Sequence, residues 1–283
     1  MSAFQAIVLA LLQGVTELFP VSSLGHSVVI PGLLGWRIDQ SAPTFLAFLT
    51  LLHVGTATAL VLYFRQEWWA IARALLRSAV SGRLRGDDEE RLGWMLVLGT
   101  IPLGLAGFFF ESAVRTFFGS PRLASIFLVL NGVLMYAGER ARRRAIAFDD
   151  GRTDLARLTL RQAVGIGASQ VLAFLPGIYR SGSSITAGLL AGLRHESAAR
   201  FSFLLATPAI AAAGLLEVPR LFDAAARPYL GLFLIAAVLS GIAAYLSVAY
   251  LMRYFRGGRL DPFALYCAAF GLAAFVLLTM LHR

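Results

Sequence analysis

The stretch Glu17-Leu-Phe-Pro-Val-Ser-Ser-Leu-Gly-His26 interrupts an otherwise apolar run at residues 3–35. A second stretch, Leu175-Pro-Gly-Ile-Tyr-Arg-Ser-Gly-Ser-Ser184, interrupts another apolar run at residues 161–193. Each half-segment beside a break has about 11 to 16 residues, too few for a helix rising about 1.5 Å per residue to cross a bilayer. Irregular backbone is tolerated at membrane depth only where it is buried in protein or lines a cavity. Each stretch therefore predicts a re-entrant helical hairpin.

The composition of the whole chain also indicates a membrane protein. Of its 283 residues, 58% are apolar and 14% are charged, and the mean hydropathy is +0.72. A soluble domain has about 45–50% apolar and 25% charged residues, which excludes an ordinary soluble enzyme. We predict an all-α integral membrane protein with six transmembrane helices plus two re-entrant broken-helix hairpins. The six spans are residues 44–64, 92–111, 121–138, 200–217, 229–250 and 262–281.

The order of these segments predicts an inverted-topology repeat. Residues 1–138 hold the first hairpin and three spans, and residues 161–283 hold the second hairpin and three spans. Residues 139–160 form a basic loop between them. Because three crossings are an odd number, the second copy is inverted relative to the first. This architecture places a site between the two breaks, near the bilayer midplane.

The basic residues predict an orientation. The chain carries a net charge of +9, and its arginines form short clusters between apolar runs, which speaks against nucleic acid as a partner. With the amino terminus outside, eighteen of the 25 arginines fall inside and six outside. This bias favours a topology with both termini outside. The first hairpin then enters from the outer face, where we expect the site to open.

Two charged residues are left out of this pattern. Arg180 lies at the tip of the second break, and Glu17 is the one acid among sixteen that lies neither in a loop nor at the end of a span. A lone charge at the bilayer centre costs about 2.5–3.5 kcal/mol, so such a residue indicates a functional site. The alternative is that Arg180 only locks the two hairpins together through Glu17.

The residues around the breaks are suited to a phosphate. Serines at Ser22–Ser23 and Ser181–Ser183 precede half-helices that we expect to begin near Leu24 and Ser184. Helix starts attract anions through free N–H groups and the helix dipole. The guanidinium of Arg180 can bind two phosphate oxygens at once.

Candidate groups for metal binding and proton transfer lie beside the first break. Glu17 can hold a metal, act as a base or pair with Arg180, and Gln13 lies four residues earlier on the same helical face. Mg²⁺ or Ca²⁺ prefers such oxygen donors and is often shared with substrate phosphates, so we expect the cation to arrive with the substrate. His26, three residues after Ser23, is suited to proton transfer or to attack on phosphorus.

A second histidine is interpreted differently. His53 lies inside the first full span and has no charged neighbours in sequence. We interpret it as a structural residue.

These motifs resemble those of a known family. Gln13-Gly-Val-Thr-Glu-Leu-Phe-Pro-Val-Ser-Ser-Leu-Gly-His26 resembles the (E/Q)-x-x-x-E and P-V-S-S-x-G-H segments of the bacterial undecaprenyl-diphosphate phosphatases, the BacA/UppP family. Pro176-Gly-Ile-Tyr-Arg-Ser-Gly-Ser-Ser184 resembles its P-G-x-S-R-S-x-x-T motif, and residues 201–208 are similar to the span that follows. The resemblance covers essentially the whole chain. Tyr179 departs from the motif's Ser, and Ser184 departs from its Thr.

The resemblance implies an enzyme that removes the terminal phosphate of undecaprenyl diphosphate. Its product is the lipid carrier for peptidoglycan, and the activity counters bacitracin. The implied location is the bacterial cytoplasmic (inner) membrane, with membrane lipids and the polyprenyl diphosphate as partners; a homodimer stays open. The implied catalytic residues are Glu17, Ser23, His26 and Arg180. The substrate-binding candidates are Gln13, Ser22, Tyr179, Ser181, Ser183 and Ser184.

Three questions stay open at this point. The nucleophile is His26, Ser23 or water. The same half-helices also suit a transporter or flippase for a lipid phosphate or another anion. A non-catalytic envelope scaffold is a third class. Tyr179, which departs from the motif, would be consistent with a family member that has lost the phosphatase activity.

Overall fold

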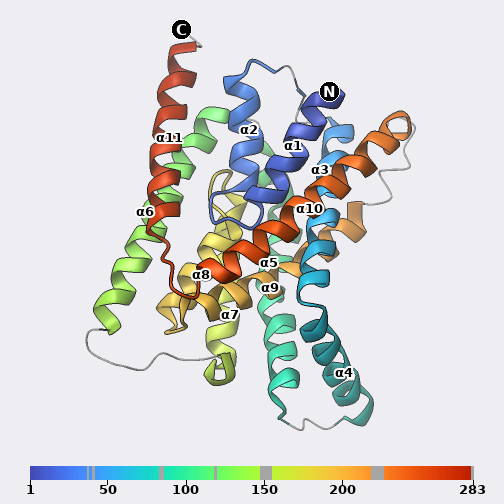
Figure 1. Ribbon diagram of the computed structural model, residues 1–283, viewed down its shortest axis with the longest axis vertical. Coiled ribbons are helices and arrows are strands. Elements are labelled where there is room, and N and C mark those ends of the chain that lie inside the picture. The colour runs from blue at the N-terminus through green and yellow to red at the C-terminus, as the bar shows by residue number, and fades with distance from the viewer. Residues whose placement is uncertain are drawn as a thin grey trace.

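The computed structural model describes residues 1–36, 38–39, 42–82, 86–117, 120–146, 155–217 and 226–281. Within these ranges the fold is helical and contains no β-strand (Figure 1). The short 3₁₀ helices are η1 (Leu155–Arg157), η2 (Gln170–Phe174) and η4 (Arg227–Tyr229). The α-helices are α1 (Ala3–Thr16), α2 (Ser23–Leu33), α3 (Pro43–Tyr63), α4 (Arg65–Ser81), α5 (Asp88–Phe117), α6 (Pro121–Ile146), α7 (Leu160–Ser169), α8 (Arg180–Leu190), α9 (His195–Glu217), α10 (Leu230–Tyr254) and α11 (Asp261–Leu281).

Five of these helices are long and apolar enough to span a membrane, so the chain has the character of a multi-pass membrane protein. These segments are Thr44–Tyr63, Asp88–Phe109, Pro121–Arg144, Arg227–Tyr254 and Asp261–Leu281. They correspond to five of the six predicted spans. The remaining predicted span, residues 200–217, lies within α9, which does not meet the same criteria over its described part. Residues 201–206 of α9 are all buried.

Both predicted breaks separate two helices. The chain leaves α1 at Thr16 and re-enters a helix at Ser23, and α1 packs on α2. In the second segment α7 continues into η2, and after a break at residues 175–179 the chain enters α8. Helix α8 begins at Arg180, four residues before the start expected from the serines.

The two breaks lie against each other and against α6. A Cβ atom at Gly25 would lie 3.2 Å from the Cα of Gly177, whose φ of +115° requires glycine. The buried side chain of Asn131, from α6, joins the two segments. Its Nδ2 donates a hydrogen bond to the carbonyl oxygen of Pro20 at 3.4 Å, and its Oδ1 accepts one from the backbone N–H of Tyr179 at 3.2 Å. Asn131 therefore fixes the position of one break relative to the other.

Helix α10 runs beside the first hairpin and supports it. It packs on both α1 and α3 (Figure 1). Gly14 permits this approach, because a Cβ atom there would lie 2.3 Å from the carbonyl oxygen of Ser240. On the other side of the molecule, α6 packs along α11. Helix α1 begins and α11 ends at the same end of the molecule (Figure 1).

Some arginines that set the expected orientation lie outside the described residues. They are Arg37, Arg83, Arg85, Arg152, Arg220 and Arg283.

Candidate functional site

A cavity of about 530 Å³ opens beside the two breaks. Its polar lining comes mainly from the first break and α2, from α3 and from the start of α8. The rest of its wall is apolar and comes from α3, α5, η2 and α9, with residues such as Leu46, Leu103, Phe174 and Ile210. A cavity with one polar end and long apolar walls fits a molecule with a charged head and a hydrocarbon tail.

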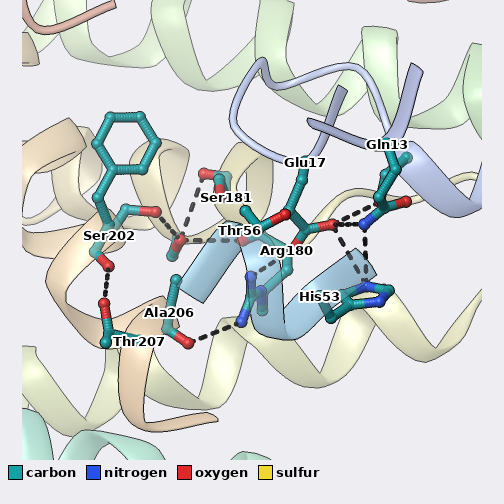
Figure 2. A network of polar contacts seen from close by, with 12 residues as sticks. Gln13, Glu17, His53, Thr56, Arg180, Ser181, Ser202, Ala206 and Thr207 are labelled. Carbon is teal, nitrogen blue, oxygen red and sulfur yellow. Dashed lines mark hydrogen bonds and ion pairs between the residues drawn. The ribbon is translucent and has the colours of Figure 1, made fainter. Parts of the chain in front are cut away.

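The carboxylate of Glu17 is the centre of the polar end (Figure 2). It is 4% exposed, yet both of its oxygens are paired. Oε1 accepts a hydrogen bond from Nη2 of Arg180 at 2.7 Å. Oε2 accepts one from Oγ of Ser23 at 2.6 Å and one from Nε2 of Gln13 at 3.0 Å. The structure therefore brings together four of the residues predicted from the two separate breaks.

Arg180 is held in place by the first turn of α8 and by α9. Its Nη1 donates a hydrogen bond to the carbonyl oxygen of Ala206 at 3.2 Å, while Nη2 binds Glu17 (Figure 2). No side chain caps the start of α8, where Tyr179 is the residue before the helix. The first N–H groups of a helix have no partner within the helix, so this start can bind an anion next to the guanidinium.

His53 also belongs to this group, which the sequence interpretation missed. Its Nδ1 donates a hydrogen bond to the carbonyl oxygen of Leu49 at 2.8 Å. Nε2 lies 3.1 Å from Nε2 of Gln13 and 3.6 Å from Oε2 of Glu17 (Figure 2). His53 lines the cavity. The signal was present, because a polar ionisable side chain inside an apolar span marks a functional site as a charged one does.

His26 does not lie in this group. Its Nδ1 donates a hydrogen bond to the carbonyl oxygen of Ser22 at 2.7 Å, and its Nε2 accepts one from the hydroxyl of Tyr266 at 2.9 Å. The ring stacks on Tyr266 and Phe270, at centroid distances of 5.7 and 4.7 Å. Both nitrogens are thus occupied on the side of α2 that faces α11. Among the described residues, His53 is the histidine that lines the cavity.

The two serines of the first break have different partners. Ser22 has a φ of +72°, the one positive value among the described residues other than glycine, and its Oγ accepts a hydrogen bond from the N–H of Gly25. It is thus the N-cap of α2, which begins at Ser23, one residue before the start expected near Leu24. Ser23, the first residue of α2, directs its hydroxyl to Glu17 and lines the cavity. The strained turn at Ser22 therefore presents the Ser23 hydroxyl to the site.

The serines of the second break do not precede their helix, as the sequence interpretation expected, but lie inside it. Ser183 Oγ donates a hydrogen bond to the carbonyl oxygen of Tyr179, and Ser184 Oγ donates one to that of Arg180. Ser184 is also within 2.7 Å of the hydroxyl of Ser202. Ser181 is buried, and none of these three serines lines the cavity. Because α8 begins four residues early, the hydroxyls of Ser183 and Ser184 bind back to the preceding turn.

Tyr179 occupies the wall of the cavity beside Arg180. The residue is 3% exposed, and its backbone N–H is held by Asn131. Tyr179 lines the cavity, where its side chain is larger than the serine of the motif that it departs from.

The groups that could hold a cation are few. No cluster of three or more His, Cys, Asp or Glu residues suited to a metal lies within the described part of the chain. One carboxylate, one imidazole nitrogen and one amide do converge, from Glu17, His53 and Gln13. Oε1 of Gln13 is buried with no hydrogen-bond partner among the described residues. If the Gln13 amide turned over, three metal ligands would face one another.

The sequence is similar to a family of known proteins over almost its whole length. The family described as "Bacitracin resistance protein BacA" matches residues 6–273. An undecaprenyl-diphosphatase of Acidiphilium cryptum is 50% identical over 98% of this chain and 99% of its own length. One of Mycolicibacterium paratuberculosis is 47% identical over 99% and 98%, and undecaprenyl-diphosphatase 2 of Burkholderia thailandensis is 48% identical over 96% and 95%.

Proposed function

The chain belongs to the bacitracin resistance protein BacA family, and we propose that the cavity around Glu17 and Arg180 is where it hydrolyses undecaprenyl diphosphate. The reaction consumes water and yields undecaprenyl phosphate and inorganic phosphate. It returns the lipid carrier to cell-wall synthesis and opposes bacitracin. One observation above all supports this site: a buried carboxylate, a serine hydroxyl and an arginine from two distant breaks meet at the polar end of an apolar cavity.

The substrate lies with its diphosphate at the polar end and its hydrocarbon along the apolar wall. Arg180 and the uncapped start of α8 bind the terminal phosphate. Phosphoryl transfer depends mainly on positioning and on stabilising the charge of the phosphoryl group, which these groups supply. When phosphate binds, it competes with Oε1 of Glu17 for the guanidinium of Arg180, while Oε2 of Glu17 stays beside Ser23.

Ser23 is the nucleophile that the geometry favours. Its hydroxyl lies 2.6 Å from Oε2 of Glu17, which takes the proton as the oxygen attacks the terminal phosphorus. The bond from that phosphorus to the bridging oxygen breaks, and undecaprenyl phosphate leaves. Water then attacks the phosphorus of the phosphoseryl group, the bond from phosphorus to the Ser23 oxygen breaks, Glu17 returns its proton to that oxygen, and inorganic phosphate is released. His26 is a positioning residue here, because its bond to the Ser22 carbonyl fixes the turn that presents Ser23.

A divalent cation, Mg²⁺ or Ca²⁺, fits beside these groups. Glu17, Gln13 and His53 would hold it, and it would neutralise charge on the phosphates. Three protein ligands leave several coordination positions to substrate oxygens and water. These residues would therefore hold the cation together with the substrate.

The placement in the membrane follows the arginine distribution. The protein is an inner-membrane enzyme with both termini outside and the cavity open to the outer, periplasmic face. The α1–α2 and α7–α8 segments are re-entrant hairpins of two inverted repeats. Their pairing at Gly25 and Gly177 supports this arrangement.

Phosphate release from a C55 diphosphate by the purified protein tests the function. We expect release that a chelator lowers by at least about tenfold and that added Mg²⁺ or Ca²⁺ restores. A broken-helix pair with buried charges also suits a transporter. If the protein released no phosphate but moved a lipid phosphate across liposomes, the phosphatase proposal would be wrong and transport would be favoured.

The two histidines give a matched pair of variants for the cation. We expect His53→Ala to raise the Mg²⁺ concentration needed for half-maximal activity by at least about tenfold, because it removes a metal ligand. His26→Ala should lower kcat without changing that concentration, because His26 faces α11. Metal titrations of phosphate release measure both. An equal shift in the two variants, or none in His53→Ala, would contradict the assignment of His53.

A further inference from the structure

A second polar cavity lies away from the site, where three parts of the chain meet. It has a volume of about 390 Å³, and its wall comes from the carboxyl-terminal part of α6, the start of α9 and the connection between α10 and α11. We name it the basic pocket. Its arginines are Arg142, Arg143, Arg194, Arg256 and Arg259.

The floor of the basic pocket is formed by a hydrogen-bonded network around Glu139. Glu139 is 1% exposed, and its Oε2 is bound by Nε2 of His195 at 2.7 Å and by the N–H of Leu260 at 3.5 Å. Its Oε1 accepts a hydrogen bond from Arg143 at 3.3 Å. The ring of His195 stacks on Phe255. Both oxygens of this acid are therefore engaged at the floor of the pocket.

The remaining charges leave the pocket positive. Glu196 forms an ion pair with Arg256 at 3.4 Å. Asp261, which does not line the pocket, forms an ion pair with Arg143. Among the described residues of the lining there are five arginines and two glutamates, so arginines outnumber acids there. Helix α9 begins at His195, and the positive end of its dipole adds to the attraction for an anion.

We propose that the basic pocket binds a phosphate group, either as inorganic phosphate or as the head group of an anionic phospholipid. Guanidinium groups bind phosphate oxygens in pairs, and arginines from different segments can surround one phosphate. Arginines at helix ends also balance helix dipoles and orient a membrane protein. Balancing a dipole or orienting the protein does not require a cavity. Here, however, arginines from three distant segments line the same cavity. This proposal does not depend on the proposed phosphatase activity.

The test compares two pairs of charge removals on the full-length purified protein. Arg142→Gln/Arg259→Gln removes two charges from the pocket, and Arg140→Gln/Arg144→Gln removes two exposed charges of α6 that do not line it. Each pair is made in an Arg180→Ala background, so that phosphate bound at the catalytic cavity does not contribute. Inorganic phosphate binding is measured by calorimetry. Stabilisation is measured as the shift of the melting temperature caused by phosphatidylglycerol relative to phosphatidylcholine.

We expect the pocket pair to lose at least about tenfold in phosphate affinity, or to lose the shift caused by phosphatidylglycerol, while the control pair keeps both. Loss of the first identifies free phosphate as the ligand, and loss of the second alone identifies a lipid head group. Equal losses in both pairs, or none in either, would overturn the proposal. Arg142→Lys/Arg259→Lys should recover part of the binding. The same substitutions with Arg180 intact should leave phosphate release unchanged, which reports correct folding.

Discussion

Arg180→Ala is expected to lower kcat/KM for hydrolysis of undecaprenyl diphosphate by about 10³-fold or more. The guanidinium of Arg180 donates a hydrogen bond to Glu17 at the polar end of the cavity, and the transferred phosphoryl group needs it for charge stabilisation. Arg180→Lys keeps the charge but not the paired donors, so we expect a smaller loss. Steady-state phosphate release with purified variants measures these effects.

Arg180→Ala also removes the partner of a buried acid, which must be separated from the catalytic effect. An unpaired buried charge destabilises a protein by about 3–5 kcal/mol, so the variant should melt at a lower temperature. The double variant Glu17→Gln/Arg180→Ala contains no such charge and should regain much of this stability without regaining activity. If the double variant were active, Arg180 would serve only to lock the hairpins, and the proposed role in catalysis would be wrong.

Ser23→Ala is expected to cause a loss of kcat on the order of 10⁴-fold, with little change in stability. The change removes the hydroxyl that contacts Glu17 and leaves the rest of the polar group intact. Phosphate release measures the loss. Rapid quenching of the parent protein with terminally labelled substrate should leave label on Ser23, identified by peptide mapping.

Ser22 provides the matched control for Ser23. Its side chain caps α2 and its φ is +72°, so Ser22→Gly relieves the strained backbone, and replacing a serine cap by glycine costs only about a few tenths of a kcal/mol. We expect this variant to lose less than about tenfold in kcat. If Ser23→Ala hydrolysed the substrate as well as Ser22→Gly does, water would be the nucleophile and the phosphoserine step would be wrong.

The sequence predicted five of the apolar spans, the two breaks, and the Glu17–Arg180 pair that lies at the centre of the site. Long apolar runs identify membrane helices, because a segment inside the bilayer must hydrogen-bond its own backbone groups and a helix does so. The interruptions in the two apolar runs coincide with the breaks between α1 and α2 and between α7 and α8. Glu17 and Arg180 stand out because a charge in an apolar segment is expensive. The structure places Nη2 of Arg180 2.7 Å from Oε1 of Glu17.

The start of α8 shows where local rules fail. Serines favour the position before a helix, which predicted a start near Ser184. The helix begins instead at Arg180, and Asn131 holds the N–H of the preceding residue. This hydrogen bond joins residues 48 positions apart, so it cannot be predicted from the local sequence.

The sequence by itself thus determined the class of the protein, its breaks and the charged pair at their tips. Only the tertiary structure decided that His53 faces the cavity and that His26 is held against α11 by Tyr266. The physical reason is that membrane helices such as α3 are apolar on every side. Lipid is as apolar as the protein interior, so the hydrophobic pattern does not show which face turns inward. Rotation about each helix axis is set by packing, as at Gly14 against α10.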